Sequence, residues 1–186
     1  MLYAQLHLTL PPWIHQGIDA MRLYPDDESK LGLAIELSRL NVDRKTGGPF
    51  GAAVFNADGR VVGVGVNRVV QLNCSVAHAE MMAFMTAQQR MLRYRLNEDG
   101  QRMTLATSSQ PCCQCYGASI WAGIDEMLIG ARAEDVMSLT EFDEGPLPSD
   151  WLGELARRGI EVRRDIRREE ARAVLAAYGA AGGAMY

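Results

Sequence analysis

Two short stretches constrain this chain more than any other part of its sequence: His78-Ala79-Glu80 and Pro111-Cys112-Cys113-Gln114-Cys115. On a helix, residues three positions apart share a face, so Cys112 and Cys115 can bind one metal ion, whereas Cys113 points away from it. Each stretch stands where a helix is expected to begin, and the positive end of a helix dipole favours the thiolate that binds metals. With His78 as the third donor, the pattern predicts a zinc site.

Three protein ligands leave a tetrahedral zinc ion one open position for water, which distinguishes a catalytic site from a closed structural one. Water bound there ionises near pH 7. Glu80, which follows His78 by two residues, is placed to move that proton without binding the metal. A fourth protein ligand would instead indicate a non-catalytic module stabilised by zinc. Cys74 precedes His78 closely enough to leave this alternative open.

Length and composition fit one domain, residues 1–186, in which 48% hydrophobic residues are typical of a globular protein. The formal net charge of −4 gives no general attraction to nucleic acid. Four cysteines are too few for a disulfide scaffold, and two are needed as zinc ligands. Because the N-terminus lacks a signal-peptide pattern and no apolar run approaches the ~18 residues of a membrane span, we expect a cytoplasmic protein without membrane contact.

Apolar spacing and turn residues predict alternating helices and strands, which indicates an α/β sandwich. Helices are expected over 29–44, from about 78 onward, and over 112–121 and 168–178, and strands over 51–57, 60–66, 103–107, 126–131 and 160–164. Ser29 is expected to cap the first of these helices.

Both ends of the chain are expected to lie outside the predicted α/β sandwich. Residues 1–27 are expected to form an N-terminal extension, with a short extended segment before Pro11-Pro12, and with Trp13 and Ile14 packed on the domain. The tail 179–186 is rich in Gly and Ala. It is expected either to fray or to fold against another part of the protein.

The His-x-Glu and Pro-Cys-x-x-Cys motifs resemble those of the cytidine deaminase superfamily of zinc-dependent nucleobase deaminases. Further stretches resemble the guanine deaminase branch: Gly47-Gly48-Pro49-Phe50-Gly51-Ala52-Ala53-Val54, Asn67-Arg68-Val69-Val70 and Phe142-Asp143-Glu144-Gly145-Pro146. The resemblance implies a three-layer α/β/α sandwich of the cytidine deaminase type, with a mixed sheet of about five strands and one Zn²⁺ per subunit. It also implies hydrolysis of guanine to xanthine and ammonia by zinc-activated water.

The same resemblance assigns roles to individual residues. Glu80 would pass a proton to the purine ring nitrogen, and Glu144 would help ammonia to leave, with Asp143 as the alternative carrier. The amide of Asn67 would read the O6/N7 edge of a purine, and aromatic rings would form the pocket walls. The predicted substrate-binding residues are Asn67, Phe50, Phe142, Ala79 and Trp121.

The resemblance also implies a homodimer paired across the zinc helices, in which a C-terminal segment can close a site. Trp121 and the terminal Tyr186 are candidates for this closing role. Either the chain's own site or that of the partner would be closed.

Two other substrate classes remain open. A tRNA adenosine deaminase would share the zinc motifs, but residues 133–156 hold several acids and no Lys or Arg, which would repel RNA phosphates. A basic cluster nearer the C-terminus is interleaved with acids, which is typical of a solvated, salt-bridged face: Arg157, Arg158, Arg163, Arg164, Arg167, Arg168 and Arg172. Another amino-purine base, a nucleoside or an aminotriazine such as ammeline would present a similar edge, and pocket volume would decide among them.

Overall fold

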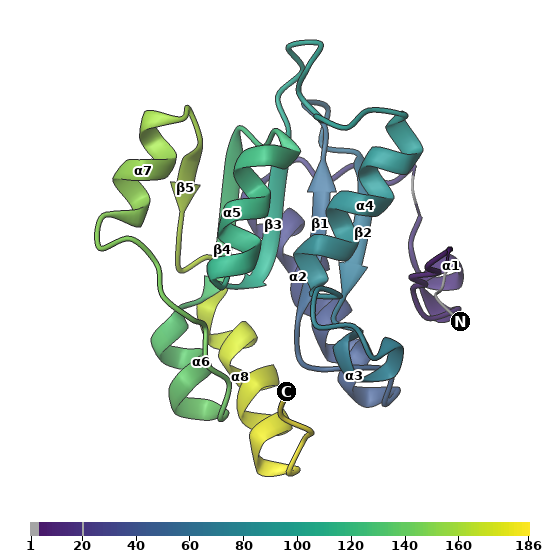
Figure 1. Cartoon of the computed structure of the whole chain (residues 1–186), viewed down its shortest axis with the longest axis vertical. Helices are drawn as coiled ribbons and strands as arrows, with labels where there is room; N and C mark the ends of the chain where they lie inside the picture. The colour runs from purple at the N-terminus through teal and green to yellow at the C-terminus, as the bar shows by residue number, and fades with distance from the viewer. Residues whose placement is uncertain (1–3, 20) are drawn as a thin grey trace.

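A five-stranded mixed sheet forms the centre of the computed structural model, which describes residues 4–19 and 21–186 (Figure 1). The strand order is β2-β1-β3-β4-β5. β1 pairs antiparallel with β2 and β3, whereas β4 runs parallel to both β3 and β5. The predicted α/β fold is confirmed, with strands at Gly51–Phe55 (β1), Val61–Val66 (β2), Thr104–Ser109 (β3), Glu126–Ala131 (β4) and Glu161–Arg163 (β5).

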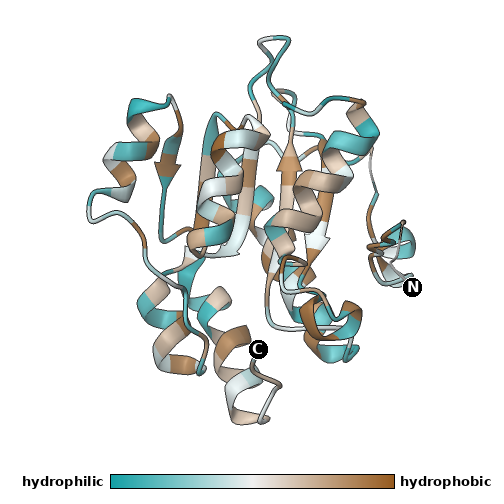
Figure 2. Cartoon of the chain, in the orientation of Figure 1, coloured by the Kyte–Doolittle hydropathy of each residue, from teal (hydrophilic) through white to brown (hydrophobic). Residues whose placement is uncertain are grey.

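Helices cover both faces of this sheet and give it three layers. Phe55 and Ala106 pack in one core layer with α2 and α8, whereas Val54 and Leu105 pack in the other with α4 and α5. This division follows from the two-residue period of a strand, and Figure 2 shows the apolar residues concentrated along the strands. The helices are Trp13–Gly17 (α1), Asp27–Asp43 (α2), Val69–Leu72 (α3), Ala79–Met91 (α4), Cys113–Ala122 (α5), Ala133–Leu139 (α6), Trp151–Arg157 (α7) and Arg168–Ala180 (α8).

Helix α4 lies directly against β2 because two glycines leave no side chain between them. A β-carbon on Gly65 would collide with the carbonyl oxygen of Ala79, and one on Gly63 would collide with the backbone of α4 near Ala87. Glycine in a strand weakens it but permits such close approach. The two glycines therefore allow α4 to lie close against β2, and this close packing places His78 and Glu80 at the start of the helix.

Local boundaries differ from the sequence-based expectation where short polar interactions decide them. Helix α2 is capped by Asp26 and not by Ser29. The Asp26 side chain accepts from the Ser29 N–H at 2.7 Å, and the Ser29 hydroxyl oxygen accepts from the Asp26 N–H at 3.3 Å. Helices α6 and α7 lie in the acidic stretch that showed no predicted element. Each has only seven residues, too few for apolar periodicity to mark it.

Within the described part of the N-terminal region, Trp13 and Ile14 pack on the domain, and residues 4–10 form no strand. Trp13 and Ile14 are buried, and the indole N–H of Trp13 donates to the Thr46 hydroxyl at 3.0 Å. None of the helices in the described part of the chain combines the length and apolar character that a membrane crossing needs.

Buried Asp135 joins α6 to α8. Its carboxylate accepts from Arg168 Nε at 2.7 Å and Nη2 at 2.8 Å, and also from Arg172. The hydrogen bonds from Arg168 lower the pKa of Asp135 to about 2, and the positive charge of Arg172 acts in the same direction. This pairing holds α8 beside the segment that runs from α6 into the acidic loop.

Replacing Asp135 with Asn should lower the free energy of unfolding by about 3 kcal/mol at neutral pH, because two arginines lose their buried partner. The folded-state pKa of Asp135 lies below its unfolded value, so its contribution is present above about pH 4 and is lost as the pH falls towards 2. Urea denaturation of both proteins at several pH values will measure the difference, which should shrink under acid conditions.

Glu134→Gln is the matched control, since Glu134 is exposed in the first turn of the same helix. It should change stability by less than about 0.5 kcal/mol. Equal losses in the two variants would show that Asp135 has no special structural role.

Candidate active site

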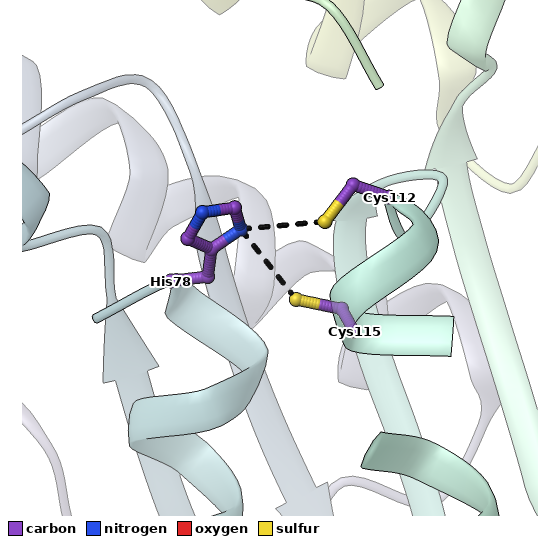
Figure 3. Close-up of side chains that lie close together, drawn as sticks. All are labelled: His78, Cys112 and Cys115. Carbon is purple, nitrogen blue, oxygen red and sulfur yellow. Dashed lines mark hydrogen bonds between the residues drawn. The ribbon is translucent and has the colours of Figure 1, made fainter. Parts of the chain in front are cut away.

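The three predicted metal ligands come together at the beginnings of α4 and α5 (Figure 3). His78 is the N-cap residue of α4 and Cys112 that of α5, while Cys115 lies one turn further along α5. His78 Nδ1 lies 3.4 Å from Cys112 Sγ and 3.7 Å from Cys115 Sγ. Tetrahedral zinc with ordinary bond lengths places nitrogen and sulfur ligands about 3.5 Å apart. The donor set and its spacing therefore fit Zn²⁺, and these residues form a zinc site.

The remaining cysteines lie outside this grouping. Within residues 4–19 and 21–186, the grouping gathers no fourth protein donor, so neither Cys74 nor Cys113 closes it. Cys113 is exposed, and its backbone N–H donates to the carbonyl oxygen of Glu144 at 3.0 Å. This geometry argues against a closed structural zinc site.

The two ligand thiols are electrostatically unequal. A hydrogen bond from the Cys115 thiol, followed by that from His78, lowers the pKa of Cys112 to about 4 against the opposing effect of burial. The same bond raises the pKa of Cys115, since its thiol is the donor, and burial raises it further. A bound zinc ion would take both sulfurs as thiolates, so metal binding would release protons from this pair.

Glu80 lies beside the metal ligands without joining them. It is 7% exposed, and its Oε2 accepts from the Cys115 thiol at 3.3 Å. The Thr107 hydroxyl lies 3.2 Å from its Oε1. Burial raises the pKa of Glu80, and the neighbouring Cys112 thiolate raises it further. A carboxylate in this position is suited to taking up and returning a proton.

A cavity of about 280 Å³ opens onto the zinc ligands. This volume is at the lower limit of the range for ligand pockets, so a small, flat molecule suits it better than a large one. Its lining combines aromatic rings, amides and carboxylates: Phe50, Asn67, Val69, Ser75, His78, Glu80, Gln110, Cys112, Phe142, Asp143, Glu144 and Tyr186.

Aromatic rings form one part of the cavity. The ring centroid of Phe142 lies 5.2 Å from that of Phe50 and 4.8 Å from that of Tyr186. Tyr186 lines the cavity, so the segment 179–186 folds against the cavity of its own chain. Phe142 also stacks on Tyr178 of α8, with centroids 6.1 Å apart. The tail and the acidic loop are therefore packed together.

The two acids of the loop differ in their surroundings, although both line the cavity. Asp143 is exposed, and its Oδ1 already accepts from the Gly145 N–H at 2.9 Å. Glu144 is half-buried, and its pKa is raised to about 8, first by burial and then by the negative charges of Cys112 and Glu80. The surroundings of Glu144 thus favour its protonated form.

Asn67 is buried at the cavity wall in a fixed orientation. Its Oδ1 accepts from the Val69 N–H at 3.3 Å, and its backbone carbonyl accepts from Asn41 Nδ2 at 2.9 Å. Asn67 is one of the residues that line the cavity.

Two predicted substrate-binding residues lie elsewhere. Ala79 is buried behind the cavity wall and does not line it. Trp121 is 79% exposed, in an apolar groove with Met81, Met85 and Tyr94. The structure therefore does not place Trp121 with the other predicted binding residues, because α5 carries it away from the zinc end. Its closing role towards a partner's site stays a prediction.

Sequence reasoning missed Gln110 and Ser75, which both line the cavity. Gln110 is 8% exposed, and its side-chain amide makes no hydrogen bond with any described residue. Its position immediately before Pro111 was the available signal, because residues next to the zinc motif must lie near the metal.

Comparisons with known proteins agree with this geometry. The family model of the cytidine and deoxycytidylate deaminase zinc-binding region matches residues 25–131. A solved guanine deaminase from Nitrosomonas europaea is similar over 97% of this chain and 99% of its own, with 40% identity and a TM-score of 0.91. Guanine deaminase of Bacillus subtilis is 37% identical over 108 residues, 58% of this chain and 66% of its own length. A tRNA-specific adenosine deaminase of Buchnera aphidicola is 29% identical over 127 residues, 68% of this chain and 77% of its own.

Zinc content will separate the ligand cysteines from Cys113. Cys112→Ser and Cys115→Ser should each lower the zinc stoichiometry well below one per chain, because a hydroxyl is a poor substitute for a thiolate ligand. Cys113→Ser should keep one zinc per chain. Elemental analysis of the purified proteins measures this directly, and loss of zinc from the Cys113 variant would show that the ligand set is misassigned.

Proposed function

Because this chain belongs to the family of the cytidine and deoxycytidylate deaminase zinc-binding region, we propose that it hydrolyses guanine to xanthine and ammonia. The observation that carries the proposal is a second acid, the half-buried Glu144, in the same small cavity as Glu80 and the zinc ligands. The similarity to a guanine deaminase over nearly the whole of both chains supports it.

The reaction exchanges one bond of the purine for another. Water adds to the ring carbon that bears the amino group, a carbon–oxygen bond forms, and the carbon–nitrogen bond to the amino group breaks. A bound Zn²⁺ supplies Lewis acidity and lowers the pKa of water to near 7. The chain's own residues must then hold the base and move protons between the water, the ring and the leaving nitrogen.

Two carboxyl groups divide the proton transfers. Glu80 takes the proton from the attacking water and returns it to the ring nitrogen beside the reacting carbon. Amide ion is a poor leaving group, so the departing nitrogen needs another proton. Glu144, whose pKa is raised to about 8, donates that proton. It then takes up the proton of the new hydroxyl as the carbon–oxygen double bond forms and ammonia leaves. Asp143 is less suited, since it is exposed and already hydrogen-bonded to its own loop.

Recognition uses an amide and two rings. The Asn67 side-chain NH2 group can donate to the O6/N7 edge of guanine, both atoms of which are acceptors, while its oxygen accepts from the Val69 N–H. Phe50 and Phe142 offer faces and edges against which a flat base stacks. The cavity's modest volume favours a free base over a nucleoside.

An RNA substrate finds less support. Most arginines of the C-terminal basic cluster are occupied by acids of their own chain: Arg157 and Arg158 pair with Glu154, Arg163 with Asp27 and Glu161, Arg167 with Glu170, and Arg168 and Arg172 with Asp135. Paired arginines contribute little to phosphate binding. These ion pairs make the basic cluster a salt-bridged face, as its interleaved acids predicted.

We also propose that the active form is a homodimer in the cytoplasm. The groove between α4 and α5 exposes large apolar side chains, among them Trp121 and Tyr94, which is typical of a protein interface. None of the four cysteines is in a disulfide, which is typical of proteins in a reducing compartment.

Ammonia release from a set of amino-heterocycles tests the proposed substrate. Zinc-loaded protein should turn over guanine faster than guanosine, adenine, cytosine, cytidine, ammeline or a tRNA anticodon stem-loop. Faster turnover of the stem-loop than of guanine would overturn the proposal.

Glu80→Gln should keep zinc and the fold but lose activity by a factor of about 10² to 10⁴, because the proton carrier is gone.

Dimerisation is tested by placing a charge in the groove. Trp121→Glu should shift the protein towards monomer in analytical ultracentrifugation, because the interface would have to bury that carboxylate. Met137→Glu is the matched control, since Met137 is an exposed apolar residue on α6, outside the groove. The same oligomeric state for wild type and the Trp121 variant would remove the groove as the interface.

A further inference from the structure

The hydroxyl of Thr107 is the polar group of the sheet that reaches the catalytic carboxylate. Thr107 lies on the central strand β3, between Ala52 of β1 and Ile129 of β4. Both neighbours belong to the apolar core layer beneath α4 and α5, and Thr107 itself is 2% exposed. A hydroxyl buried in such a layer destabilises the fold unless it is hydrogen-bonded.

Two acceptors satisfy this hydroxyl. Its Oγ1 lies 2.9 Å from the carbonyl oxygen of Ser109 and 3.2 Å from Glu80 Oε1. Ser109 ends β3 and leads through Gln110 and Pro111 to Cys112. Thr107 therefore connects the carboxylate on α4 with the strand end that carries the two ligand thiols.

The Glu80 carboxylate has one polar contact that does not depend on the protonation of a metal ligand. Oε2 faces the Cys115 thiol at 3.3 Å, which as a zinc ligand would have no hydrogen to donate, whereas Oε1 faces the Thr107 hydroxyl. Rotation about the last side-chain bond of a glutamate is soft, so the contact with Thr107 restrains the plane of the carboxylate. A hydroxyl has one hydrogen and two lone pairs. It can donate to the carboxylate, or donate to Ser109 and accept from the carboxylic acid, and so it can hold the group throughout a proton transfer.

We propose that Thr107 is a positioning residue, whose hydroxyl fixes the Glu80 carboxylate in the orientation that proton transfer requires. The inference rests on the proposed deaminase chemistry, in which Glu80 moves the proton. Proton transfer depends strongly on geometry, and a misplacement of about 1 Å can reduce rates by about a hundredfold. A group that merely fills the core would have no such effect.

Thr107→Val and Thr107→Ser separate positioning from packing. Valine keeps the shape and removes the hydroxyl, whereas serine keeps the hydroxyl and removes a methyl group. With the zinc-loaded enzyme, the valine variant should lower kcat by about ten- to a hundredfold with KM changed by less than about twofold. The serine variant should stay within about threefold of wild type. Wild-type kcat in the valine variant, or equal losses in both variants, would overturn the assignment.

Thr104→Val is the matched control on the same strand. Thr104 is equally buried, and its hydroxyl donates to Glu126 Oε2 at 2.8 Å, away from the cavity. It should lower stability and leave kcat unchanged. A similar loss of kcat in this control would show that the effect of Thr107 is a general consequence of altering β3.

Crystal structures of the zinc-loaded variants supply a readout that does not depend on the substrate. The Glu80 carboxylate should be rotated or spread over two conformers in the valine variant and should keep its wild-type orientation in the serine variant. An unchanged carboxylate in the valine variant would overturn the inference. If wild type fails to deaminate guanine, the proposed substrate is wrong, but the crystallographic comparison still decides the role of Thr107.

Discussion

The structure depends on one geometric requirement: the first turns of α4 and α5 must meet at one edge of the sheet. His78, Cys112 and Cys115 come from two helices that are far apart in the chain, and only this meeting brings their donor atoms within 4.8 Å of one another. The central strand β3 leads directly into α5, while Gly63 and Gly65 let α4 lie directly on β2. The zinc site is therefore fixed by backbone packing and not by flexible loops.

Acidic groups are concentrated around this meeting point. Cys112, Glu80 and Glu144 all line one cavity. Burial and mutual repulsion raise the pKa values of both glutamates. A bound cation offsets part of that repulsion, which explains why such a site suits Zn²⁺. Proton-carrying groups with raised pKa values are typical of sites that perform acid–base chemistry near neutral pH.

The far side of the cavity is supported from the C-terminal half of the chain. Asp135 pairs with two arginines of α8, and Tyr178 of the same helix stacks on Phe142. Phe142 in turn contacts Phe50 and Tyr186. The acidic loop that carries Glu144 therefore rests on α8, and its backbone accepts a hydrogen bond from the start of α5 at Cys113. This support makes the position of Glu144 a property of the whole fold.

The sequence alone indicated the α/β class and proposed His78, Cys112 and Cys115 as zinc ligands. The strand period of two residues marked the sheet, and the spacing of three residues placed both cysteines on one helix face. The short helices α6 and α7 were not predicted, since seven residues give little periodicity. Non-local packing alone decided that Tyr186 folds into its own chain's cavity, that Trp121 faces away from it, that Asp135 is buried and that Thr107 reaches Glu80. Such contacts join elements that are far apart in the chain. The type of a residue and its local spacing do not specify these partners, because the packing of the whole backbone brings them together.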